Sequence, residues 1–164
     1  MAVRLPNRGF AVPASGAERW QQIAEARALA EPAILRLSLA RGGVDWEVRV
    51  RAAHHRLART PVWMPDRTHF SDEWAEAHRQ FHRALLDGCG NTMLMETFDR
   101  MWTASELARR WSGNIAPERD GATEHAELEK AALARDADQA AELLRRHITL
   151  TAQALGKSQT AQNK

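Results

Sequence analysis

The chain has 164 residues, of which 44% are hydrophobic and 27% charged, and its net charge is +2. These values are ordinary for one soluble globular domain, and the lack of a long basic block excludes a nucleic-acid-binding tail. No apolar run approaches the roughly 18 residues of a membrane span, and the single cysteine cannot form an intramolecular disulfide, so we expect a protein of the reducing cytoplasm.

Residues 1–14 differ from the rest of the chain. They carry two prolines and a glycine and show no helical period. Phe10 and Val12 alternate with smaller residues, and Pro13 follows them. The pattern predicts at most one short strand.

From residue 15 onward, apolar residues recur at helical spacing. Ser15 to Glu18 forms a capping-box pattern, and Asp45, Asn91 and Asp136 are suitable N-cap residues. Gly156 is expected to end the last helix and to leave a polar tail over 156–164. The predicted helices cover 15–40, 45–58, 71–87, 92–112, 122–134 and 136–155. The fold class is therefore an all-α antiparallel bundle of about six helices, preceded by a short strand-like segment.

Two histidines four residues apart, His78 and His82, share one face of the third predicted helix with Trp74 and Phe81. That face is apolar, so both imidazoles should point inward. A single inward histidine is usually a core residue with a satisfied hydrogen bond. A pair at this spacing more often prepares a metal or ligand site, although the Glu of the metalloprotease motif is missing here.

His125 and His147 lie on the inward faces of the last two predicted helices. Four imidazoles in one core would need four sets of hydrogen-bond partners, and each unsatisfied ring would cost about 1–3 kcal/mol. A divalent transition metal would remove that cost and stabilise the fold. Imidazole ligands suit Zn, Ni, Cu or Fe better than Mg or Ca.

Arg27 lies in the middle of the apolar stripe of the first predicted helix. A buried guanidinium is costly unless it is paired. It could pair with Glu31, four residues further on, or it could hold an anionic ligand, because arginine binds carboxylates with two parallel hydrogen bonds. The sequence leaves both interpretations open.

Three stretches together resemble a known family. They are HRQFHRALLDGCGN at 78–91, EHAELEKAALARDADQAAELLRRHITLT at 124–151, and the R-x-x-x-E pattern of Arg27 and Glu31. They resemble the FCD domain (named after the C-terminal domain of FadR), the effector-binding domain of GntR-family transcription regulators. The resemblance covers about 15–155, and the six helices are similar to the shorter, VanR-like branch.

The resemblance implies four metal ligands, His78, His82, His125 and His147. The family often has Asp at the position of His78, and the change to His removes a negative charge and favours Zn or Ni over Mn. The resemblance also implies a small organic acid effector at the metal, for which Arg27 would be a second anchor. It further implies a homodimer.

The chain departs from the family at its N-terminus. Members normally begin with a winged helix-turn-helix, and here only 5–12 resembles its last wing strand, so residues 1–14 would be the remnant of the wing and a linker. A wing strand cannot read bases alone. We therefore expect no DNA-binding residues in this chain, and DNA binding only if that module is supplied upstream. A naturally shortened regulator, a fragment and a misplaced start all fit.

Three functions follow from these residues. The first is a metal-dependent, effector-sensing regulatory domain without catalytic residues. The second is a metal-free interaction module that dimerises with a full-length regulator. The third is a metalloenzyme, which lacks an evident general base because Glu124 neighbours His125 in the sequence and is expected to point away from it.

Overall fold

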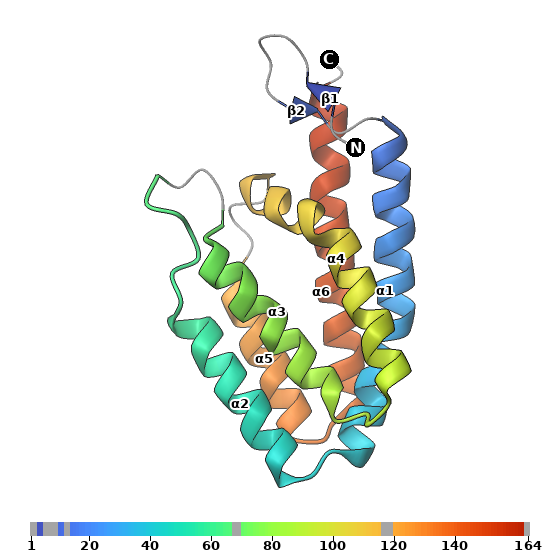
Figure 1. Cartoon of the computed structure of the whole chain (residues 1–164), viewed down its shortest axis with the longest axis vertical. Coiled ribbons are helices and arrows are strands. Elements are labelled where there is room, and N and C mark those ends of the chain that lie inside the picture. Colours follow the sequence, from blue (N-terminus) through green and yellow to red (C-terminus); the bar gives the residue numbers. More distant parts are fainter. Residues whose placement is uncertain (1–2, 5–9, 12–13, 67–69, 116–119, 163–164) are drawn as a thin grey trace.

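The computed structural model describes 3–4, 10–11, 14–66, 70–115 and 120–162, with side chains described over 18–66, 70–106 and 120–153. Six helices account for most of the described residues (Figure 1). They are α1 (Ala14–Arg41), α2 (Val44–Arg59), α3 (Asp72–Asp87), α4 (Thr92–Ile115), α5 (Gly121–Leu133) and α6 (Ala137–Gln162). The predicted all-α bundle is confirmed.

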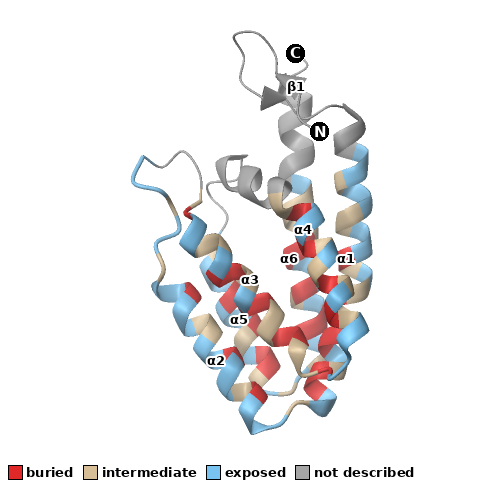
Figure 2. Cartoon of the chain, in the orientation of Figure 1, coloured by how far each residue is buried: buried red, intermediate tan, exposed pale blue. Residues whose placement is uncertain are grey.

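The helices pack around α6, which contacts α1, α4 and α5, while α2 contacts α3 and α5. The first turn of α1 and the last turn of α6 lie at the same end of the bundle (Figure 1). Buried residues line the faces where the helices meet (Figure 2). The largest of these side chains are Trp46, Trp102, Phe81 and Phe98. None of the helices in the described part of the chain is long and apolar enough to cross a membrane.

Two very short strands precede the bundle, where one was predicted. β1 (Val3–Arg4) pairs antiparallel with β2 (Phe10–Ala11), with Val3 opposite Ala11. The prediction missed β1 because two residues are too few to show an alternating pattern. The wing-strand interpretation rests mainly on 5–9 and 12, which lie outside the described residues.

Side-chain caps begin three helices, and two of them, at Asn91 and Asp136, were predicted. Ser71 Oγ accepts a hydrogen bond from the backbone N–H of Trp74 at the start of α3. The side chains of Asn91 and Asp136 accept equivalent bonds at the starts of α4 and α6. Each cap satisfies a backbone N–H that has no partner inside its helix, and so fixes the residue at which the helix begins.

Three predicted helix ends were wrong. α1 begins at Ala14, before Ser15, and α2 has Gly43 at its N-cap with no side-chain cap. Asp45 instead lies in the first turn of α2, where its charge favours the positive end of the helix dipole. α6 continues through Gly156 to Gln162. A glycine inside a helix costs only about 1 kcal/mol, too little to stop a helix whose neighbours are good helix formers.

Trp46 of α2 packs against the C-terminal ends of both α1 and α3. Its ring is buried, and Nε1 donates to the carbonyl oxygen of Ala84 at 2.9 Å. Gly42 and Gly88 lie against the ring so closely that a Cβ on either would approach its atoms to within 2.7 and 2.8 Å. Both positions therefore require glycine. This contact fixes the C-terminal end of α3, the helix that carries His78 and His82.

Substituting Gly88→Ala is expected to destabilise the fold by about 1–3 kcal/mol, the usual cost of forcing an extra methyl group into a packed site. The free energy of unfolding in urea measures the effect. Gly121→Ala is the matched control, since Gly121 is the first residue of α5 and a Cβ there would meet nothing within 4 Å. Equal stability of the two variants would contradict the role assigned to the Trp46 contact.

Candidate metal centre

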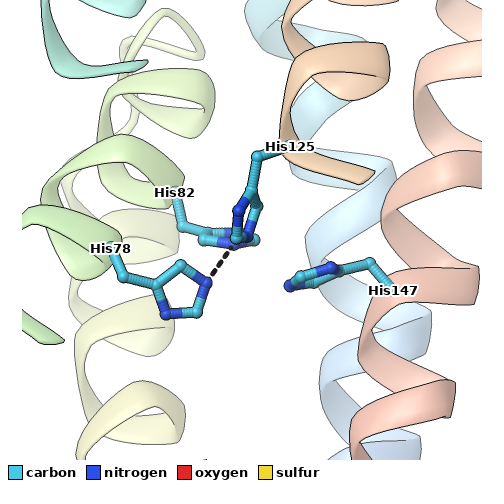
Figure 3. Close-up of side chains that lie close together, drawn as sticks. All are labelled: His78, His82, His125 and His147. Atoms are coloured by element: carbon cyan, nitrogen blue, oxygen red, sulfur yellow. Dashed lines mark hydrogen bonds between the residues drawn. The ribbon is translucent and has the colours of Figure 1, made fainter. Parts of the chain in front are cut away.

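The four predicted histidines come together from three helices. His78 and His82 lie on α3, His125 on α5 and His147 on α6, and their rings converge in the middle of the bundle (Figure 3). All four are buried, with exposed fractions between 1% and 9%. The helical spacing explains the α3 pair, because residues four apart lie on the same face one turn from each other.

One ligand nitrogen from each ring lies within 4.8 Å of the others. Nε2 of His78 and Nε2 of His82 lie 3.0 Å apart. In a tetrahedral zinc site, ligand bonds of about 2.0–2.1 Å place neighbouring nitrogens about 3.3–3.4 Å apart. The α3 pair is close to that spacing, and the ligand atoms of all four rings lie within 4.8 Å of one another. The donor set therefore fits a divalent transition metal.

Aromatic rings surround the histidine cluster, meaning His78, His82, His125 and His147. Trp74 stacks on His78 with ring centroids 4.7 Å apart and an angle of 21° between the planes. Trp102 lies 5.3 Å from both α3 histidine rings. An apolar shell of this kind limits access of water and lowers the local dielectric constant, which strengthens the binding of an ion by its ligands.

Glu124 contacts the histidine cluster through His147, which sequence reasoning did not predict. Its Oε2 accepts a hydrogen bond from Nδ1 of His147 at 2.7 Å. Glu124 and His125 are adjacent on α5, so their side chains point in different directions. The side chain of Glu124 reaches His147 on α6. The sequence argument considered only His125, the neighbour of Glu124 in the chain, so it could not reveal a partner on another helix.

Asp120 fixes the start of α5 just before these two residues. Its carboxylate accepts hydrogen bonds from the side chain and the backbone N–H of Thr123, at 2.6 and 3.0 Å. The same bonds lower the pKa of Asp120, because they favour its charged form. The cap therefore sets the turn of α5 from which Glu124 and His125 project.

Arg27 forms the buried ion pair that was one of its two predicted roles. Its guanidinium bonds to both carboxylate oxygens of Glu31, at 2.5 and 3.3 Å, and to Ser105 Oγ at 3.1 Å. It also lies over the ring of Trp102, 5.0 Å from the centroid. Trp102 therefore contacts both Arg27 and the histidine cluster. Sequence reasoning identified Glu31 but missed Ser105 and Trp102, which come from α4.

Comparisons with known proteins identify the family. The FCD domain matches residues 22–150. The chain belongs to the FCD domain family. It is 35% identical over 146 residues to the uncharacterized HTH-type transcriptional regulator BphR of Paraburkholderia xenovorans, and 31% identical over 146 residues to the HTH-type transcriptional repressor GlaR of Escherichia coli. The matches cover 86% of this chain but only 58% and 66% of the two regulators.

Solved structures agree with this assignment at the level of the fold. A GntR-family transcriptional regulator from Pseudomonas syringae superposes with a TM-score of 0.74 at 20% identity, over 99% of this chain and 67% of that one. McbR/YncC of E. coli superposes with a TM-score of 0.72 at 15% identity, over 96% and 77%. The predicted resemblance to the FCD domain of GntR-family regulators is confirmed, and the domain is regulatory rather than enzymatic.

Proposed function

We propose that this FCD domain binds one divalent transition metal through His78, His82, His125 and His147, and that a small organic carboxylate binds to that metal as the effector. The observation that carries the proposal is the set of four buried imidazoles whose ligand atoms lie within 4.8 Å. Imidazole nitrogens and the absence of a carboxylate ligand in this set favour Zn or Ni over Mn, Mg or Ca.

Arg27 is the proposed second anchor for the effector. A guanidinium has five N–H donors, and three hydrogen bonds join Arg27 to Glu31 and Ser105. The two remaining N–H groups supply donors for a further carboxylate. Since Arg27 packs on Trp102, which packs on His78 and His82, an acid of a few carbon atoms could reach both the metal and the guanidinium.

Five helices meet around this proposed site. The histidines come from α3, α5 and α6, Arg27 comes from α1, and Trp102 and Ser105 come from α4. A ligand that contacts all of them favours one packing of the bundle over others, and that difference in affinity is what shifts a conformational equilibrium. In the whole regulator, we propose that the shift changes how two subunits of a homodimer present upstream winged helix-turn-helix modules to DNA.

Titration calorimetry with small organic acids tests the proposal. We expect binding heat with zinc-loaded protein and none after treatment with EDTA. Arg27→Lys keeps the charge but loses the planar fork of donors, and is expected to weaken acid binding about tenfold or more, since a hydrogen bond to a charged group contributes about 1.5–3 kcal/mol. The zinc content of this variant should not change. Acid binding that is indifferent to EDTA would contradict the proposal.

One observation favours the alternative, a metal-free interaction module that dimerises with a full-length regulator. The sequence argument assumed that four buried imidazoles are hard to satisfy without a metal. Here His78 and His82 can hydrogen-bond each other, and His147 bonds to Glu124. Two measurements separate the two functions: a module of this kind would take up no metal, and it would co-purify with a full-length GntR-family protein.

A further inference from the structure

We infer that Glu124 is a positioning residue that sets the charge of the metal centre, so that it strengthens binding of the cation and weakens binding of the effector anion at the same site. The inference rests on the proposed metal site and goes beyond it, because Glu124 belongs to none of the expected ligand or effector residues.

The contact between Glu124 and His147 fixes the state of the imidazole. A carboxylate can only accept hydrogen bonds, so the proton of the 2.7 Å bond lies on Nδ1 of His147. A neutral ring protonated at Nδ1 carries its lone pair on Nε2. In Figure 3, the ring of His147 extends from α6 toward the other three histidines, and the ring edge farthest from α6 faces them. Glu124 therefore prepares His147 to bind a metal through Nε2.

The contact is shielded from solvent. The side chains of His147 and Glu124 are 10% and 24% exposed. Water and salt screen charges less in such surroundings than at an open surface. The negative charge of Glu124 is therefore screened less at the histidine cluster than a charge at an open surface would be.

A count of the neighbouring charges shows why this carboxylate matters. Four neutral imidazoles bring no charge to a bound cation, and the charges of Arg27 and Glu31 cancel in their ion pair. Glu124 places a negative charge directly against a ligand ring. The negative charge therefore comes from a residue that supports a proposed ligand rather than from a proposed ligand itself.

The charge of Glu124 has opposite effects on the affinity for the metal cation and on the affinity for the effector anion. Glu124 attracts the divalent cation and repels the carboxylate effector, since Coulomb energy changes sign with the charge of the partner. Removing the charge should lower the affinity for metal and raise the affinity for an anion on the bound metal. A residue with only a structural role would weaken both when it is changed.

The chain contains a matched control. Glu129 also lies on α5, and its Oε2 lies 2.8 Å from Nδ1 of His54 in a contact of the same kind. The side chains of this pair are 15% and 13% exposed, so the pair is also shielded. His54 is not one of the four clustered histidines. Glu129→Gln therefore removes the same charge from the same helix without touching the proposed site.

The experiment compares Glu124→Gln with Glu129→Gln. Gln keeps an oxygen that can accept the hydrogen bond from His147, so the fold should be retained, and circular dichroism checks this. Zinc affinity is measured by competition with a chromogenic chelator. Acetate affinity is measured from the visible absorption of the cobalt-loaded protein.

Glu124→Gln is expected to lower zinc affinity about 10- to 100-fold, as loss of such a partner of a ligating histidine usually does. It is expected to raise acetate affinity by about threefold or more, as removal of a nearby negative charge should. Glu129→Gln should leave both unchanged.

The outcomes separate this inference from the proposed function. If the unaltered chain binds zinc but Glu124→Gln weakens both affinities, or changes neither, the inference is overturned while the metal site stands. If the unaltered chain binds no metal, the proposed function fails and the inference fails with it. If Glu129→Gln has the same effect as Glu124→Gln, the effect belongs to the overall charge of the domain and the inference is again overturned.

Discussion

Zinc or nickel added to the metal-free chain is expected to raise its midpoint of thermal unfolding by about 10 °C. In the proposed site the metal would bind the four histidines of the folded bundle, and it has no comparable site in the unfolded chain. Free metal at 1,000 times the dissociation constant then stabilises the fold by about 4 kcal/mol. For a domain of this size, each kcal/mol raises the midpoint by about 2–4 °C. Differential scanning calorimetry measures the shift directly.

Calcium and magnesium are the controls for this expectation. Both prefer oxygen ligands, and the four clustered residues offer only imidazole nitrogens. We therefore expect no shift with either ion at the same concentration. A shift of equal size with magnesium, or none with zinc and nickel, would be incompatible with a transition-metal site in the histidine cluster.

Substituting Glu31→Ala is expected to destabilise the chain by about 3–5 kcal/mol, because it leaves the guanidinium of Arg27 buried without its counter-charge. Both side chains are almost fully buried, at 6% and 0% exposed, so little solvent can compensate. The free energy of unfolding in urea gives the value. This loss of stability would come from leaving the charge of Arg27 buried and unpaired, rather than from the net contribution of the ion pair to stability.

A double substitution separates those two quantities. Arg27→Met together with Glu31→Leu removes both charges and keeps the volume similar, and such exchanges of buried pairs are often neutral or stabilising. We expect the double variant to be much closer to the unaltered chain than Glu31→Ala is, and to bind the effector acid poorly. A Glu31→Ala variant of unchanged stability would argue against a tightly buried ion pair within α1.

Helix content and the histidine cluster were predictable because they depend on local spacing. The 3.6-residue period located six helices, and the inward faces of three of them identified all four histidines. Caps at Asn91 and Asp136 were predicted and begin two helices, since a side-chain cap is encoded within four residues.

The features that sequence reasoning missed depend on contacts between helices. Glu124 faces α6 because α5 packs against that helix, and no pattern within α5 shows it. Ser105 and Trp102 approach Arg27 only because α1 lies against α4. Close approach of Gly42 and Gly88 to Trp46 is likewise a property of three packed elements. The sequence therefore predicted the four histidines that cluster, and the packing of the bundle determines the residues around them.

The central claim is that His78, His82, His125 and His147 hold a metal ion. Elemental analysis of the purified chain, beside the double variant His82→Ala, His147→Ala, tests it most directly. The double variant removes one ligand from α3 and one from α6, so two imidazoles are left, fewer than the three or four protein ligands of a typical zinc site. We expect about one Zn or Ni per unaltered chain and none in the double variant. A chain that holds no metal after incubation with zinc and nickel, or a double variant that keeps it, would contradict the account.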